Sequence, residues 1–200
     1  MRKGLWIGAA LAAAAGTGAA WSQEPKEPPP PGADMMKKWM EFATPGKPHE
    51  LLEGMIGTWD ITTSVTMTPG AAPVEEKGEV VNRWVLGKRF VESRMTGTMF
   101  GMPAEGTSLF GYDNFRRRYV ATFASSLGTS IHRSEGGTDR TGKAIVLWGT
   151  LDEFLDGTVG KPVTHVFRFD GPDEMTMEVH DPEIGAPNTL VVRTRCRRRK

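Results

Sequence analysis

Cysteine and long hydrophobic runs are nearly absent from this 200-residue chain. Cys196 is its only cysteine, so no intramolecular disulfide can form and the fold must be held by its hydrophobic core. No stretch approaches the roughly 20 apolar residues that a membrane-spanning helix needs. We therefore expect no stable insertion into a membrane.

Motifs of common catalytic and metal sites are also missing. The expected mature chain has no G-x-S-x-G turn and no glycine-rich phosphate loop. Its histidines form no H-x-H or H-x-x-x-H pair, so the sequence indicates no zinc site. We predict no catalytic residue and no metal site. An enzyme that uses Ser125 or Ser126 with His132 is an alternative, and so is a Cu(I) site built from methionines and a histidine.

The chain also has no strong excess of positive or negative charge. The chain has 25 Lys and Arg residues against 24 Asp and Glu residues, which gives a formal net charge of +1. Six of the basic residues crowd positions 193–200, so the rest of the chain is acidic in balance. A nucleic-acid-binding face is basic over a wide area. We therefore expect no nucleic acid as a partner.

Residues 1–22 have the pattern of a secretory signal peptide. A basic start precedes a short apolar run, and Ala20 and Ser22 have the spacing of a cleavage site. We expect export to the periplasm or the medium, without a lipid anchor, since no cysteine stands at the cleavage point. Residues 23–33 are rich in proline and are expected to be an extended tether, and residues 34–200 to be a single domain.

A short amphipathic helix is expected after the tether, with Asp34 as its cap. Apolar side chains recur there at helical spacing, at Met35, Met36, Trp39, Met40 and Ala43. We expect this helix to cover one mouth of the domain.

From Thr58 onward the hydrophobic period changes from 3.6 to 2, which is typical of strands. One face of the first strand carries Trp59, Ile61, Thr63, Val65 and Met67. Further alternating runs fall at 78–86, 89–98, 107–112, 118–125, 129–135, 143–151, 163–169, 175–179 and 189–197. Short strands separated by turn signals predict an all-β fold: an antiparallel, calycin- or lipocalin-like β-barrel of about 8–10 strands, with a short N-terminal helix.

Closure of the barrel at one end is assigned to Trp59. The indole lies at the start of the first strand, and the last strand supplies Arg193 and Arg195. An arginine laid over the indole face would add a cation–π attraction of about 0.5–2 kcal/mol. We predict this pairing as the barrel closure.

Two blocks resemble known barrels. The G-T-W at 57–59, after a short helix, resembles the Gly-x-Trp signature of the lipocalins and the wider calycin group. The block GYDNFRRRYVATF at 111–123 resembles the turn-and-aromatic segment that those proteins carry in the middle of the barrel.

The order of several blocks resembles the bacterial domain-of-unknown-function family 1579. These blocks are TPGKPHELLEGMIGTWD, GKRFVE and FGMPAEGTSLFGYD, and the similarity runs from about Met36 to Arg197. The family's usual Trp and Asp in the mid-barrel strand appear here as Phe123 and Ser125. The resemblance implies a calycin-like barrel and no particular activity.

The faces assigned to the interior are rich in methionine and aromatic residues. A barrel of this size is either filled by side chains or holds one small ligand, and methionine adapts to apolar guests. We predict that a ligand would contact Trp84, Phe90, Met95, Phe123, His165, Phe167, Met175 and Met177.

His165 interrupts this apolar face. We interpret it as a core histidine that bonds a neighbouring hydroxyl; the alternative is a haem ligand, as in nitrobindin-type barrels that the chain resembles only at the fold level. The function predicted is the binding or carriage of a small apolar molecule, without a cofactor and with any protein partner left open. An enzyme that uses the same cavity and a filled barrel with a structural or interaction role are the alternatives.

Overall fold

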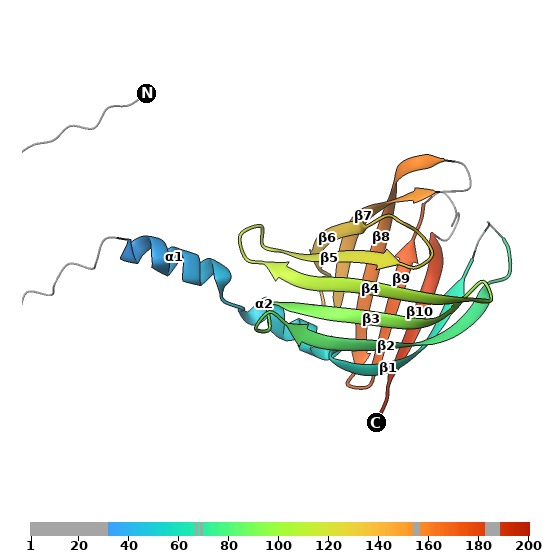
Figure 1. Cartoon of the computed structure of the whole chain (residues 1–200), viewed down its shortest axis with the longest axis horizontal. Coiled ribbons are helices and arrows are strands. Elements are labelled where there is room, and N and C mark those ends of the chain that lie inside the picture. The colour runs from blue at the N-terminus through green and yellow to red at the C-terminus, as the bar shows by residue number, and fades with distance from the viewer. Residues whose placement is uncertain (1–31, 67, 69, 154–156, 183–188) are drawn as a thin grey trace, which may run out of the picture.

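The computed structural model describes residues 32–66, 68, 70–153, 157–182 and 189–200. The predicted signal peptide, most of the predicted tether and Met67 lie outside them. Within the described residues the chain forms two α-helices, one 3-10 helix and ten strands (Figure 1). None of the helices described is long and apolar enough to cross a membrane.

All ten strands pair antiparallel in one closed barrel, with β1 hydrogen-bonded to both β2 and β10. The predicted fold class is thereby confirmed. The strands are β1 (Gly57–Val65), β2 (Val74–Val85), β3 (Phe90–Met99), β4 (Met102–Asp113), β5 (Arg118–Ser125), β6 (His132–Thr138), β7 (Ala144–Glu153), β8 (Thr158–Gly171), β9 (Glu174–His180) and β10 (Leu190–Arg198).

The alternation predicted for the first strand is present in β1. Trp59, Ile61, Thr63 and Val65 are buried, whereas the residues between them are at least partly exposed. Successive side chains of a strand point to opposite faces of the sheet. One face of each strand therefore points into the barrel and the other into solvent.

The N-terminal helix α1 (Ala33–Ala43) does not cover a mouth of the barrel. Its residues include no buried one, and it projects away from the strands (Figure 1). Its last turn is attached to the barrel, where Arg89 Nε donates to the Ala43 carbonyl at 2.8 Å. Asn114 Nδ2 in the β4–β5 turn donates to the Phe42 carbonyl at 2.8 Å. Asp34 lies in the first turn and Gly32 is the N-cap, so the prediction of an Asp34 cap is wrong.

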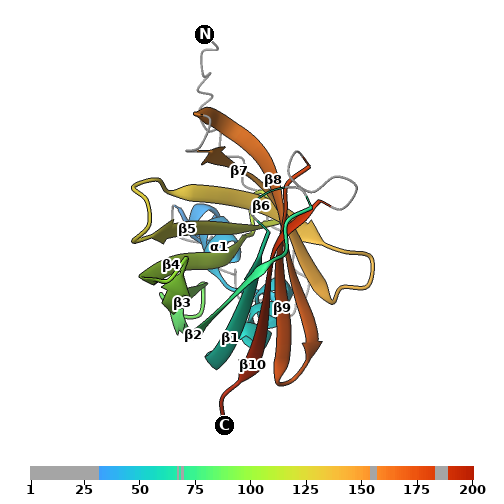
Figure 2. The same ribbon diagram turned by 90° about the vertical axis from the view of Figure 1, so that its right-hand side faces the viewer.

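One end of the barrel is closed by α2 (Lys47–Glu50) and the 3-10 helix η1 (Leu51–Met55), which lie at the end where β1 begins (Figure 1) and are seen through the ring of strands in Figure 2. Leu52 and Met55 are 0% and 2% exposed, and the Trp59 indole is 0% exposed. The indole Nε1 donates to the Met55 carbonyl at 2.8 Å. The short helical segment is thus bonded to the first strand that follows it.

Arg198 clamps this closed end. Its guanidinium carbon lies 4.1 Å from the centroid of the Trp59 ring. The guanidinium also donates to the carbonyls of Gly54 and Ile56, and its Nε donates to the Pro172 carbonyl in the β8–β9 turn. One side chain therefore joins the 3-10 helix, the first strand and the turn between two other strands.

The prediction that Arg193 or Arg195 lies over the Trp59 ring is wrong, because Arg198 takes that place. β10 turns its even-numbered residues inward, including Thr194 and Cys196, so both predicted arginines point outward. Arg193 bonds Glu178 on the outer face at 3.0 Å, and Arg195 is exposed. In the β1–β10 register Trp59 pairs with Arg198, a pairing that the sequence alone does not fix.

Glycine at position 57 is required by the same clamp. Gly57 has φ +127°, and a Cβ there would lie 2.6 Å from Nη1 of Arg198. A residue with a side chain would be strained in this conformation and would push the guanidinium away. The G-x-W block therefore makes room for the arginine as well as placing the indole.

Replacing the clamp should destabilise the fold strongly. We expect Arg198→Ala to lower the free energy of unfolding by about 3 kcal/mol, because the cation–π contact is lost and buried carbonyls lose their donor. Arg197→Ala, on the exposed face of the same strand, should change it by less than about 0.5 kcal/mol. Urea unfolding followed by tryptophan fluorescence measures both. Equal effects of the two substitutions would contradict this role of Arg198.

Candidate functional site

The barrel is hollow above its closed end. A cavity of about 350 Å³ lies between the strands and Met55 of η1. Specific small-molecule pockets are typically about 300–1,000 Å³, so the cavity is at the lower end of that range. Its wall is largely apolar, and Phe110 and Phe167 meet in it edge to face with ring centroids 4.9 Å apart.

Most of the predicted ligand-contacting residues line this cavity, and they come from strands on all sides of the barrel. They are Met95, Phe123, His165, Phe167, Met175 and Met177.

Trp84 and Phe90 do not line the cavity. Trp84 points inward at the closed end, where its Nε1 donates to Glu53 Oε2 of η1 at 2.7 Å. Phe90 lies on the outward face of β3, and its ring covers Gly111 of β4, where a Cβ would be 2.4 Å from the ring. The prediction for Phe90 failed because the neighbouring Val91, fully buried, sets the inward face of that strand.

The sequence analysis missed a row of polar residues on the cavity wall. Asn82 on β2 pairs with Ser93 on β3, and Ser93 pairs with Ser108 on β4. The next register partners along the wall are Phe123 on β5 and His132 on β6. All five side chains line the cavity. Each residue has the inward parity of its strand, so strand alternation was the signal that could have found them.

His165 lies on the cavity wall of β8 without the hydroxyl partner that we predicted. Its Nδ1 is buried and has no hydrogen-bond partner among the described residues. Burial lowers the pKa of His165 to about 4, with a smaller contribution from the nearby His132. The imidazole is therefore neutral in the folded protein near neutral pH.

Two other titratable groups face the cavity. His132 Nε2 lies 3.2 Å from the Ser130 hydroxyl. The alternative of an enzyme that uses Ser125 or Ser126 requires His132 to bond one of those two serines instead. Burial raises the pKa of the Cys196 thiol to about 12, so the thiolate that nucleophilic chemistry needs is scarce. Of the described residues that line the cavity, none is Asp or Glu.

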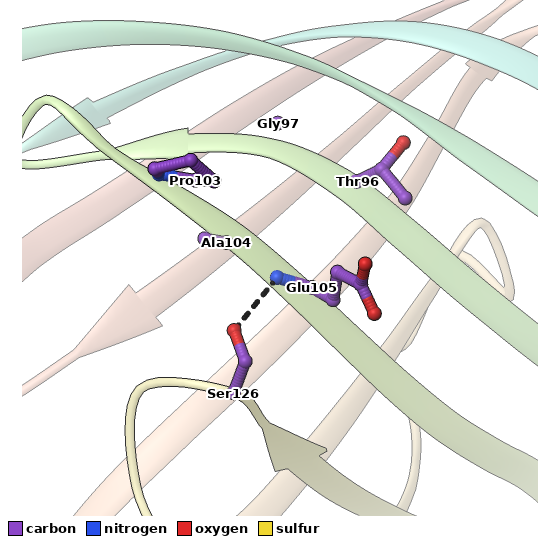
Figure 3. Close-up of a pocket in the computed structure, with 6 residues that line it drawn as sticks. All are labelled: Thr96, Gly97, Pro103, Ala104, Glu105 and Ser126. Atoms are coloured by element: carbon purple, nitrogen blue, oxygen red, sulfur yellow. Dashed lines mark hydrogen bonds between the residues drawn. The ribbon is translucent and has the colours of Figure 1, made fainter.

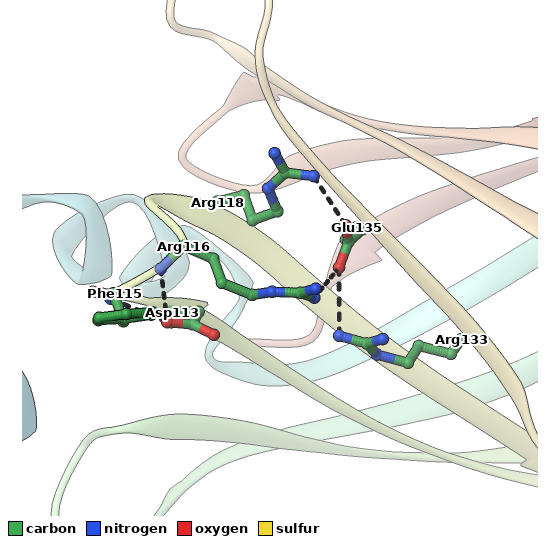
Figure 4. Close-up of polar contacts among 6 residues, drawn as sticks. All are labelled: Asp113, Phe115, Arg116, Arg118, Arg133 and Glu135. Carbon is green, nitrogen blue, oxygen red and sulfur yellow. Dashed lines mark hydrogen bonds and ion pairs between the residues drawn. The ribbon is translucent and has the colours of Figure 1, made fainter. Parts of the chain in front are cut away.

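The carboxylates of Glu135 and Asp113 lie on the outside of the barrel. Glu135 forms ion pairs with Arg116 at 2.6 Å, Arg118 at 2.7 Å and Arg133 at 3.1 Å (Figure 4). Asp113 accepts backbone N–H bonds in the β4–β5 turn of the same surface (Figure 4). These groups stabilise the outer surface and do not reach the cavity. No group of three or more His, Cys, Asp or Glu suited to a metal ion occurs in the part of the chain described.

A second hollow of about 460 Å³ lies at the edge of β3 and β4 (Figure 3). Six residues line it, and its serine is already engaged, because Ser126 Oγ accepts the Glu105 backbone N–H at 3.0 Å. Two strands and one turn cannot surround a ligand as the barrel does. The interior cavity is therefore the candidate site.

The neutral state of His165 should make the fold sensitive to mild acid. The unfolded chain binds a proton at this histidine near pH 6.5, whereas the folded protein does so only near pH 4. Stability from this group is complete above pH 6.5 and is lost as the pH falls toward 4, by roughly 3 kcal/mol in all. His165→Gln should lack this component when urea unfolding is measured across that range. Parallel pH curves for both proteins would contradict it.

Comparisons with known structures agree with this architecture. Rv2717c from M. tuberculosis superposes with a TM-score of 0.54 at 21% identity, over 77% of this chain and 99% of that one. The S-type phycobiliprotein lyase CPES from Guillardia theta superposes with a TM-score of 0.51 at 12% identity, over 81% of this chain and 97% of that one. At these identities the likeness is one of fold. No curated protein sequence matches the chain.

The family model described as "Protein of unknown function (DUF1579)" matches residues 44–198, which include α2, η1 and all ten described strands. The resemblance noted in the sequence is thereby confirmed, and the chain belongs to the DUF1579 family.

Proposed function

We propose that the protein binds or carries a small, largely apolar molecule inside its barrel. The observation that carries this proposal is the interior cavity of about 350 Å³, which is lined mostly by methionine, phenylalanine and aliphatic side chains. At about 30 Å³ for each water-sized group, such a space holds roughly a dozen heavy atoms. Transfer of apolar ligand surface from water into it is favourable by about 25 cal/mol for each Å² buried.

A filled barrel with a purely structural role fits this cavity poorly. Protein interiors are close-packed, and most of their voids are no larger than a water molecule. The cavity here is about ten times that size. Empty space of this extent forfeits packing contacts, which an apolar guest would restore.

An enzyme that uses the same cavity is the weaker candidate. His132 and His165 line the wall, but the described lining contains no carboxylate to orient or charge an imidazole. The lining also contains the thiol of Cys196. Burial raises its pKa to about 12, so it stays protonated and is a poor nucleophile. The likeness to a phycobiliprotein lyase is one of fold and transfers no reaction.

The proposal includes no resident cofactor. The buried Nδ1 of His165 has no described partner, but a cavity of about 350 Å³ without a lysine or arginine in its described lining does not fit a haem with its two propionates. Export, suggested by the N-terminal pattern of residues 1–22, would place binding in the periplasm or the medium, and the proposal does not depend on it.

Narrowing the cavity should weaken ligand binding without unfolding the protein. Ala121 on β5 lines the cavity, whereas Ala124 on the same strand has the opposite parity. We expect isothermal titration to show that n-butylbenzene binds the wild-type protein. Ala121→Leu should weaken that binding at least tenfold, on the order of 1.4 kcal/mol, because the added side chain occupies the ligand's space.

Ala124→Leu is the matched control and should bind as the wild type does. Circular dichroism of both variants checks that the barrel remains folded, since overpacking costs about 1–3 kcal/mol. Absence of butylbenzene binding by the wild-type protein, or equal binding by the two variants, would contradict a ligand site inside the barrel.

A further inference from the structure

We infer that the ligand is an uncharged amphiphile whose polar end donates a hydrogen bond, such as a medium-chain alcohol or primary amide, and that fatty-acid anions are excluded. This inference rests on the proposed function, because it concerns the same cavity. It adds the chemical class of the ligand and the wall that recognises it.

The first argument is the absence of charge from the cavity. Among the described residues that line it there is no Lys, Arg, Asp or Glu. His165 on the β8 wall stays neutral because burial lowers its pKa to about 4. A carboxylate moved from water into this space would lose its hydration and find no lysine or arginine in the described lining. The cavity therefore selects against anions.

The second argument is the polar row formed by Asn82, Ser93 and Ser108. The three residues are direct register partners on β2, β3 and β4, and neighbouring strands lie about 5 Å apart. The row therefore presents an amide and two hydroxyls over about 10 Å of one wall. Within the described part of the chain, neither serine hydroxyl has a hydrogen-bond partner.

Asn82 offers the ligand an unused hydrogen-bond acceptor. Its Nδ2 donates to the Met55 carbonyl at 2.8 Å, which fixes the direction of the amide. Its Oδ1 is buried and accepts no hydrogen bond from any described residue. Buried polar groups are normally satisfied, and each exception needs a reason. A hydroxyl or amide N–H on the ligand would supply the missing donor.

The opposite wall fits the rest of an amphiphile. β8 and β9 place Phe167, Met175 and Met177 there, and β10 adds Val192. These are flexible or flat apolar side chains, suited to an alkyl chain. A cavity for roughly a dozen heavy atoms matches a chain of medium length with one polar end.

The test compares three probes of similar size near pH 8, where carboxylic acids are ionised. 1-Decanol has a neutral donor, 1-methoxynonane has the same atoms without a donor, and decanoate carries a charge. We expect isothermal titration to show 1-decanol binding at least about tenfold more tightly than decanoate. The ether should bind about threefold to tenfold more weakly than the alcohol, since one hydrogen bond is missing.

Variants identify the wall that recognises the alcohol. The double substitution Ser93→Ala with Ser108→Ala should weaken 1-decanol binding about threefold to tenfold and leave 1-methoxynonane binding unchanged. Ser64→Ala, on the outward face of β1, is the matched control and should change neither. Asn82 is left intact because it also holds the Met55 carbonyl of the closed end.

Each outcome supports or overturns the inference. Decanoate or 1-methoxynonane binding as tightly as 1-decanol to the wild-type protein would overturn it while leaving an apolar ligand site in place. An unchanged alcohol-to-ether ratio in the double variant would overturn the part assigned to Ser93 and Ser108. Failure of all three probes and of n-butylbenzene to bind would overturn the proposed function and the inference together.

Discussion

The contact between the Arg198 guanidinium and the Trp59 indole is the interaction on which the rest of the structure depends. It joins the last strand to the first, 4.1 Å from ring centroid to guanidinium carbon, and ties both to the 3-10 helix beneath them. A barrel with ten strands is wide enough to hold more than its own side chains. Because one end is sealed in this way, the strands enclose a cavity, and this cavity is the space that a ligand can occupy.

The cavity wall combines two kinds of chemistry. Methionine, phenylalanine and aliphatic side chains line it on all sides, and Asn82, Ser93 and Ser108 add an amide and two hydroxyls in one row across β2, β3 and β4. No Lys, Arg, Asp or Glu is among the described residues that line the cavity, and on the outer face Glu135 engages three arginines. The same alternation of strand faces therefore produces a polar exterior and a mostly apolar cavity wall.

The sequence predicted the barrel well because its strands have clear alternation and frequent turn signals. It placed Trp59 correctly at the closed end, but it could not choose among the arginines of the last strand. A shift of one residue in register moves a side chain to the other face of the sheet, and only the observed register brings Arg198 to the indole. Strand alternation indicates that Ser93 and Ser108 face inward, but only the pairing of three strands brings them into one row with Asn82.

The central claim is that the barrel interior is open space with an apolar wall. A crystal structure of the protein under xenon pressure tests it most directly, because xenon enters dry apolar cavities without needing a specific polar contact. The account predicts xenon density inside the barrel, against the side chains of Phe167 and Met177, with the strands and the Arg198–Trp59 contact unchanged. A structure in which side chains fill that space and no xenon binds within the barrel would contradict it.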